Sequence, residues 1–225
     1  MASDSTTVAQ EIPAQGMVTW DSEGSEGGKY HSRKLHVPSE ASGLTIGRGS
    51  DMKSRTARQV LVDLLRAGVP RAAADALSQG AGLQGARAKQ FIRDEALGDF
   101  EITPAAQRRL FEIAYEEEAG EARRLATKDD VRRKYGPTNW EKLDPAIREM
   151  LVDLKFRGDY TPAARERIQR YVVRNDLAGF AKALADPTLW TKVPTDRFRR
   201  RRKFIEGALA QRKAAAQVVP APPAA

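Results

Sequence analysis

The chain has 225 residues, of which 41% are hydrophobic, enough for one large domain or two small ones with a buried core. It contains no cysteine and two histidines, which excludes disulfides, thiolate nucleophiles and cysteine zinc sites and leaves too few ligands to expect a metal site. The formal net charge of +8 predicts attraction to polyanions such as nucleic acid, anionic lipid or bacterial wall polymers, without choosing among them.

Residues 1–16 are small and polar and are expected to form a flexible N-terminal arm. They lack the basic and then apolar order of a secretory signal, so we expect synthesis in the cytoplasm without a signal peptide. No run of about 18 apolar residues occurs along the chain, and no membrane insertion is expected.

A short helix is predicted where Met17, Val18 and Trp20 supply an apolar run. Its C-terminal end is expected at Glu23, because the glycine that follows stops the helix. This places a carboxyl group at the end of a helix and close to a tryptophan.

Extended structure is predicted next, in a region rich in glycine. Residues 29–35 are expected to be extended, Pro38 interrupts them, and residues 42–48 alternate Leu44 and Ile46 with Thr45. We expect a small antiparallel β-sheet at about 29–52, with the proline and the glycines at its edges and turns. Glycine-rich segments lose much backbone freedom on folding, so one placed ahead of a helical body points to function.

After residue 54 the apolar residues recur with a period near 3.6, which predicts a series of helices. Thr103, Asp144 and Thr161 each precede a proline and mark three helix starts. The expected helices cover residues 55–67, 70–78, 83–96, 104–119 or beyond, 127–136, 144–156, 161–172, 177–184 and 194–213. The helix at 144–156 has the strongest apolar stripe and is expected to be the central buried one. Residues 214–225 are expected to form a disordered tail rich in alanine and proline.

These elements predict an α+β fold that is mainly helical. The order of residues ahead of the helices resembles the phage-type lysozymes, and most closely their pesticin-like muramidase branch. The pair formed by Glu23 and its glycine is followed by Tyr30, and the string SGLTIGRGSD places Thr45 and Asp51 as that branch places its threonine and aspartate. The resemblance implies one lysozyme-like catalytic domain at 17–213, with a β-lobe at about 29–52 and a helical lobe at about 54–213. It also implies a cofactor-free muramidase that cleaves peptidoglycan.

Hydrolysis of a glycosidic bond needs one group to protonate the leaving oxygen and a second to attack or to activate water. Glu23 follows the apolar run, and partial burial would favour its protonated form as the general acid. Asp51 lies in a polar turn and is expected to be the ionised base, while Thr45 is expected to hold the water that Asp51 activates. This arrangement predicts inversion at the anomeric carbon. Glu26, which is also followed by glycine, is the alternative acid.

Several of these assignments have a structural alternative. Asp51 could cap the helix that begins near residue 54, and Thr45 could be an ordinary strand residue. Tyr30, His31 and Arg48 are the expected substrate contacts. For Tyr30 a packing role is an equal alternative, and the two histidines are expected at the hairpin or the cleft edge, because they lack a third metal ligand.

The run RFRRRRK from Arg197 to Lys203 is the second feature of interest. It is typical of nucleic-acid binders, but arginines at helical spacing around phenylalanine also describe an amphipathic helix with a solvated charged face. No basic platform rich in aromatic residues accompanies it. We favour a solvated face or attraction to wall polymers, and we expect no nucleic-acid partner.

The sequence therefore predicts a monomeric peptidoglycan hydrolase that acts on glycan strands in the periplasm or on the cell wall. It would reach them after release by a holin, as a phage endolysin, or through a secretion system, as an antibacterial effector. An immunity or inhibitor protein is an expected partner. The alternatives are a catalytically inactive wall-binding protein of the same fold and, less favoured, a nucleic-acid binder.

Overall fold

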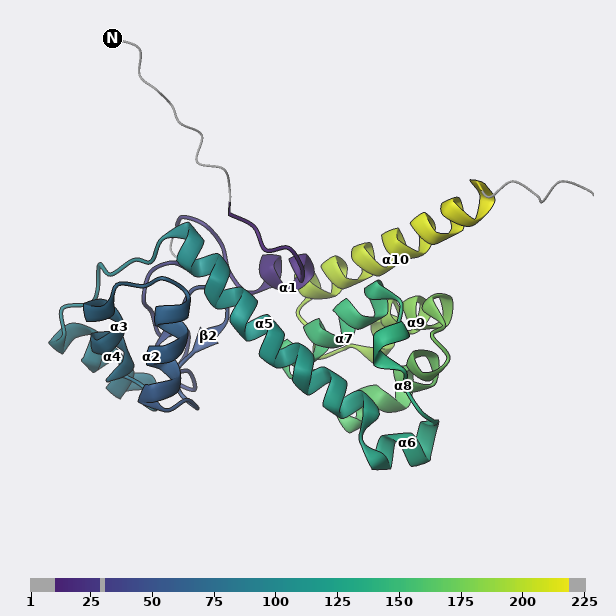
Figure 1. The fold of residues 1–225 in the computed structure, drawn as a ribbon, viewed down its shortest axis with the longest axis horizontal. Helices are drawn as coiled ribbons and strands as arrows, with labels where there is room; N and C mark the ends of the chain where they lie inside the picture. Colours follow the sequence, from purple (N-terminus) through teal and green to yellow (C-terminus); the bar gives the residue numbers. More distant parts are fainter. Residues whose placement is uncertain (1–10, 29–30, 219–225) are drawn as a thin grey trace, which may run out of the picture. The chain divides into compact units, whose positions relative to one another are not determined.

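The computed structural model describes residues 11–28 and 31–218, and its fold is mainly helical α+β, as the sequence predicts (Figure 1). The chain divides into two compact units, Met1–Tyr115 and Glu116–Ala225, which are described separately here. The boundary lies within the long helix α5 (Pro104–Thr127), which contributes residues to both units. The single catalytic domain expected at 17–213 stays a prediction.

Unit 1 carries a β-hairpin and a set of short helices around one core. Its elements are α1 (Met17–Ser22), β1 (Thr45–Ile46), β2 (Ser50–Asp51), α2 (Ala57–Arg66), α3 (Arg71–Ser78), α4 (Gly85–Asp94) and the first part of α5. The core includes Leu44, Ile46, Leu64 and Leu77, each at most 1% exposed. The helices expected at 55–67, 70–78 and 83–96 are confirmed within two residues at each end and belong to the same unit as the hairpin.

The hairpin is short and antiparallel. Thr45 pairs with Asp51, and Ile46 pairs with Ser50. The chain reverses through Gly47 and Gly49, whose φ angles of 67° and 85° lie in the left-handed region that favours glycine. The expected strand at 42–48 is therefore reduced to two residues, followed by a glycine-bearing turn.

The extended segment expected at 29–35 does not form a continuous strand in its described part. His31 bridges to Ser25, Lys34 bridges to Glu101, and His36, just beyond it, bridges to Thr45. Because each bridge uses a different partner segment, no regular ladder can form. The expectation of a sheet built from this segment is therefore wrong, although the His36 backbone does exchange two hydrogen bonds with Thr45, of 2.8 and 3.0 Å.

Residues 11–16 pack against α5, which corrects part of the expected flexible arm. Glu11 forms an ion pair with Arg108 at 2.7 Å, and Pro13 is buried. Gly16 has a φ of 78°, and a Cβ at this position would lie 2.4 Å from the ring of Tyr115. The close approach to the ring and the left-handed backbone both require glycine here. Residues 1–10 lie outside the described part of the chain.

Unit 2 is helical in its described residues and is built around α7. Its elements are the rest of α5, α6 (Asp129–Tyr135), η1 (Trp140–Lys142), α7 (Pro145–Arg157), α8 (Pro162–Val173), α9 (Leu177–Leu184), η2 (Pro187–Leu189) and α10 (Thr195–Val218). In α7, Ile147, Met150 and Leu154 are fully buried, which confirms it as the central buried helix. Side chains of Asp144 and Thr161 accept hydrogen bonds from the first turns of α7 and α8, as predicted.

Helices α5 and α10 are the longest, at 24 residues each. The expected end of α10 at residue 213 is wrong, because the helix continues to Val218 through an alanine-rich stretch, and alanine has the highest helix propensity. The disorder expected for residues 219–225 concerns residues outside the described part. Neither these two helices nor any other helix of the described residues is long and apolar enough to cross a membrane.

Candidate active site

Glu23 lies at the C-terminal end of α1, as the sequence predicts. The helix ends where the Glu23 N–H donates a hydrogen bond to the carbonyl oxygen of Thr19 over 2.9 Å. Trp20, one turn earlier, is 3% exposed and packs edge-on against Phe111 with 5.1 Å between ring centroids. Glu23 itself is half-buried. The helix end fixes its backbone beside the packed pair of Trp20 and Phe111.

Gly24 is required by space and not by its backbone conformation. It is not among the glycines with positive φ, but a Cβ at this position would lie 2.7 Å from Ser32 Cβ and 3.0 Å from Arg48 Cγ. The segment that carries Ser32 therefore passes directly over the residue that follows Glu23. The helix does end at Glu23 as expected, but Gly24 is a glycine because of this close approach and not because it adopts a left-handed helix-stop conformation.

The hairpin brings Thr45 and Asp51 together. The two residues are directly paired across the antiparallel strands, so their side chains lie on the same face. Paired positions in such a ladder have Cβ atoms about 5 Å apart. Thr45 is 7% exposed and Asp51 is half-buried. The structure thus places the expected base and the expected water-binding hydroxyl side by side.

The Asp51 carboxylate is oriented by backbone N–H groups. Its Oδ1 accepts from Lys53 N at 2.7 Å, and its two oxygens lie 3.1 and 3.2 Å from Gly43 N. The alternative that Asp51 caps α2 is wrong, because the cap is Thr56, whose hydroxyl accepts from Gln59 N at 3.3 Å while the Gln59 side chain accepts from Thr56 N at 2.9 Å. Asp51 instead closes the loop at the base of the hairpin.

The Thr45 hydroxyl points back toward the same loop. It donates a hydrogen bond to the Gly43 carbonyl oxygen over 3.3 Å. A hydroxyl that donates one hydrogen bond retains acceptor capacity for another donor such as water. The geometry is therefore compatible with a water that Thr45 and Asp51 share.

Arg48 connects the turn of the hairpin to α1. Its Nη1 donates to the carbonyl oxygens of Trp20 at 2.7 Å and Gly24 at 2.6 Å, and its Nη2 lies 3.3 Å from a Glu26 carboxylate oxygen. The guanidinium also lies 4.1 Å from the centre of the Trp20 ring. Because Arg48 is 5% exposed and uses its Nη groups inside the protein, its expected role as a substrate contact is wrong. It holds the backbone on both sides of Glu23.

Glu26 is the acceptor at the centre of a polar network. It accepts hydrogen bonds from Gln107 at 2.6 Å, Arg33 at 2.9 Å and Arg48 at 3.3 Å. Burial alone would raise the pKa of Glu26, but the hydrogen bonds from Gln107 and Arg33 and the Arg33 charge outweigh it and hold that pKa below its usual value. A general acid must hold its proton at working pH. Glu26 is therefore unsuited to be the alternative acid, and its contacts assign it to the support of the loop.

His31 is engaged at both ring nitrogens. Its Nδ1 accepts from Gly27 N at 2.6 Å, and its Nε2 lies 3.0 Å from a Glu101 carboxylate oxygen. The Gly27 contact requires an unprotonated Nδ1, so the neutral ring carries its proton on Nε2 and donates it to Glu101. His31 thus ties the loop to the segment just ahead of α5, and its expected substrate contact stays a prediction. Tyr30 lies outside the described residues.

A comparison with protein families shows where the chain belongs. A family model described as a domain of unknown function, DUF8812, matches residues 16–202, which is most of the chain. The chain is a member of the DUF8812 family. No curated protein matches it. The matched region begins at the residue before α1 and includes Glu23, Thr45 and Asp51.

Two residues of the candidate site escape sequence reasoning because their partners are distant in the chain. Gln107 is 1% exposed, receives a hydrogen bond from Ser32 at 2.7 Å and donates to Glu26, which lies 81 positions away. Glu101 forms a hydrogen bond with His31, which lies 70 positions away in the chain. The one available signal is Gln107 itself, a polar residue beside the apolar Ala106 and Leu110 of a predicted amphipathic helix.

The basic run of the DUF8812 chain is partly structural. Arg197 and Arg201 are 5% and 2% exposed and bind Asp153 of α7, at 2.6 and 2.5 Å. Burial alone would raise the pKa of Asp153, but the charges of Arg201 and Arg197 outweigh it and lower that pKa. The expected fully solvated face is thus wrong for these two arginines, while Arg200 and Arg202 are exposed. Among the described residues no group of three or more acids and histidines could hold a metal ion.

Proposed function

We propose that this DUF8812 chain is a muramidase that hydrolyses the β-1,4 bond between N-acetylmuramic acid and N-acetylglucosamine in peptidoglycan. Glu23 is the general acid, Asp51 the general base and Thr45 the residue that holds the attacking water. One observation carries the proposal. The hairpin that pairs Thr45 with Asp51 also supplies Arg48, which binds the carbonyl groups on both sides of Glu23.

The chemistry follows from the roles of two carboxyl groups. Glu23 protonates the oxygen of the departing sugar, while Asp51 removes a proton from water on the opposite face of the sugar ring. The Asp51 carboxylate accepts bonds from Gly43 and Lys53 and has acceptor positions left for that water. A water between Asp51 and Thr45 would meet two acceptors on one face of the hairpin. This route inverts the configuration at the anomeric carbon.

Loss of the acid tests the proposal. Wild-type protein is added to Gram-negative cells with permeabilised outer membranes, and clearing is followed by turbidity. We expect Glu23→Gln to lower the clearing rate by at least about 100-fold, since general acid catalysis contributes that much or more. Asp21→Asn is the matched control, because Asp21 is an exposed acid on the same helix, and it should clear at the wild-type rate.

Two outcomes would count against the assignment. Full clearing by Glu23→Gln would remove Glu23 as the acid. Binding of purified peptidoglycan by wild type without release of new reducing ends would favour the catalytically inactive wall-binding alternative. Proton NMR of the first sugar product reports the anomer, and retention would reject Asp51 as a base acting through water.

The structure weighs against the nucleic-acid alternative. That alternative relies on the basic run, but Arg197 and Arg201 form buried ion pairs with Asp153 inside unit 2. Nucleic-acid affinity depends on cations that can reach phosphates. Tight duplex binding that falls steeply with salt, together with absence of lysis, would restore that alternative.

The proposed role is that of a phage endolysin or an antibacterial effector. Both would meet peptidoglycan in the periplasm, after release by a holin or delivery by a secretion system. The net charge of +8 favours approach to the anionic wall. An immunity or inhibitor protein that blocks Glu23 is the partner expected for an effector.

A further inference from the structure

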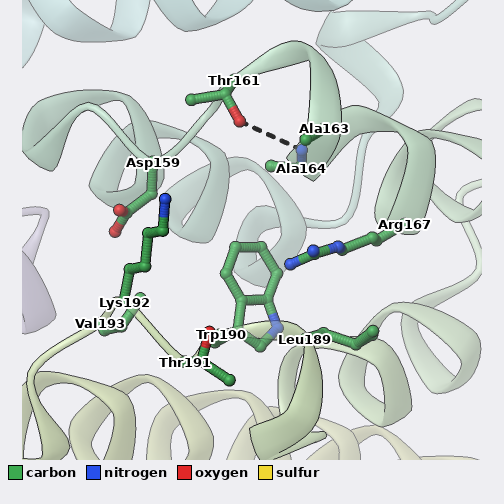
Figure 2. A pocket seen from close by; sticks show the side chains of 10 residues that line it. All are labelled: Asp159, Thr161, Ala163, Ala164, Arg167, Leu189, Trp190, Thr191, Lys192 and Val193. Atoms are coloured by element: carbon green, nitrogen blue, oxygen red, sulfur yellow. Dashed lines mark hydrogen bonds between the residues drawn. The ribbon is translucent and has the colours of Figure 1, made fainter.

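A cavity of about 260 Å³ lies in unit 2, between the start of α8 and the segment that follows η2 (Figure 2). Thr161 and Arg167 line it from the N-cap and the body of α8, while Trp190 and Lys192 line it from the segment after η2. The small side chain of Ala163 leaves room at the first turn of α8. No residue of the proposed catalytic set contributes to this cavity.

Among the described residues, the acid that lines the cavity is Asp159, and it is already paired with arginines. Asp159 accepts a hydrogen bond from Arg157 at 2.5 Å and forms an ion pair with Arg201 at 2.8 Å. Arg201 also binds the buried Asp153, which has Arg197 as a second cation. Arg157, Arg197 and Arg201 thus contact Asp153 and Asp159 behind the cavity wall, and the Asp159 carboxylate is engaged by two arginines.

Two further cations, Arg167 and Lys192, line the cavity. Within the described parts of the chain, neither Arg167 nor Lys192 forms an ion pair, and the neighbouring Glu166 is held by Lys134 at 2.8 Å. Figure 2 shows Arg167 reaching from α8 toward Trp190, while Lys192 extends alongside Asp159. A guanidinium and an ammonium at one small cavity recognise a carboxylate or phosphate group.

The wall next to these cations is apolar and rigid. Trp190 is 6% exposed, and its indole N–H donates to the Ala183 carbonyl oxygen over 2.9 Å, so only hydrocarbon remains to face the cavity. Leu189 and Val193 extend this apolar wall. Cavities that combine an apolar wall with a few charged groups are typical of small-ligand sites.

We propose that this cavity binds a compact organic anion, with its carboxylate on Arg167 and Lys192 and its apolar portion against Trp190. The source of that carboxylate rests on the function proposed above, because the peptide stems of peptidoglycan carry free carboxylates. The other source of the same chemistry is a free inorganic oxoanion such as phosphate.

Calorimetric titration of the full chain tests the proposal with three probes. They are N-acetylmuramyl-L-alanyl-D-glutamate, the same compound with both carboxylates converted to amides, and inorganic phosphate. We expect the dicarboxylate to bind, the diamide to bind at least about tenfold more weakly, and phosphate to bind more weakly than the dicarboxylate. The probe contains no bond between two sugars, so hydrolysis cannot obscure the titration.

Variants locate the site. Arg167→Met combined with Lys192→Met should weaken dicarboxylate binding by about tenfold or more. Lys182→Met removes an exposed cation that does not line the cavity and should bind as wild type does. Ala163→Phe leaves every charge in place but fills the cavity, and it should abolish binding while circular dichroism shows a folded chain.

Each contrary result overturns the proposal. Equal binding of the diamide would show that no carboxylate is recognised, and equal binding of phosphate would reduce the site to a general oxoanion site. Unchanged affinity in Ala163→Phe would place the ligand elsewhere. Failure here is separable from failure of the muramidase proposal: cell clearing without dicarboxylate binding refutes only this cavity, whereas binding without clearing refutes only the enzyme.

Discussion

At the scale of single residues, Arg48 is the side chain on which the candidate site most depends. It makes hydrogen bonds to Trp20, Gly24 and Glu26 and is almost fully buried. Burial lowers the pKa of Arg48, although Glu26 opposes that change, and the guanidinium still stays charged at any physiological pH. A buried charge is costly unless it is hydrogen-bonded, so the partners of Arg48 are needed to keep the guanidinium inside the protein.

We expect Arg48→Met to destabilise the protein by about 3 kcal/mol. The substitution removes the charged donor of two carbonyl groups and one of the three donors to Glu26, and hydrogen bonds to charged groups contribute about 1.5–3 kcal/mol each. Urea unfolding followed by tryptophan fluorescence measures the change. Arg58→Met, at an exposed site on α2, is the control and should change stability by less than about 0.5 kcal/mol. Equal stability of the two variants would show that the Arg48 contacts contribute nothing.

At the scale of elements, the hairpin depends on Gly43. The Gly43 N–H donates a hydrogen bond to the Asp51 carboxylate, and a Cβ on Gly43 would lie 2.7 Å from both Asp51 Oδ1 and Lys53 N. Backbone atoms at that distance cannot rotate away as a flexible side chain would. The loop at 43–53 and the orientation of Asp51 are thus one structural unit.

Gly43→Ala is expected to destabilise the chain by about 1–3 kcal/mol, the range for overpacked sites, and to reduce cell clearing in step with the displacement of Asp51. Gly98→Ala is the matched control, because a Cβ there meets no atom within 4 Å and its φ is not positive. Urea unfolding and the turbidity rate are measured for both. If Gly43→Ala behaves as Gly98→Ala does, the Asp51 loop is not constrained in this way.

The elements also show what can be predicted from the chain alone. Helix positions in both units follow from local periodicity, so α7 and α8 are recognised with their caps at Asp144 and Thr161. The hairpin is recognised as a glycine-rich string, but the partners of Glu26 and Asp51 are not. Gln107 meets Glu26 only because α5 packs beside the loop, and no local pattern records a contact over 81 positions. Buried ion pairs such as Asp153 with Arg201 are hidden for the same reason.

At the scale of the whole molecule, each unit holds an acid that is at least partly buried and whose pKa is nevertheless lowered in the folded state. In unit 1 burial opposes the shift at Glu26, and bonds from Gln107 and Arg33 overcome it. In unit 2 burial opposes the shift at Asp153, and the charges of Arg201 and Arg197 overcome it. Both groups therefore bind a proton less readily when folded than when unfolded, so folding is favoured where both are ionised.

The protein should accordingly lose stability in acid. The contribution of each acid is complete above its unfolded pKa, which is about 4.5 for Glu26 and 3.8 for Asp153, and is lost as pH falls through the lower folded value. We expect the free energy of unfolding in urea to decrease steadily below about pH 4.5. Asp153→Asn should weaken this dependence below pH 3.8, and it should also destabilise the protein by about 3–5 kcal/mol at neutral pH, because Arg197 and Arg201 lose the buried carboxylate charge that they share. Glu26→Gln should weaken the dependence nearer pH 4.5, with a smaller effect at neutral pH, because its carboxyl is partly exposed. An unfolding free energy that stays constant from pH 6 to pH 3 in the wild type would contradict the role assigned to both acids.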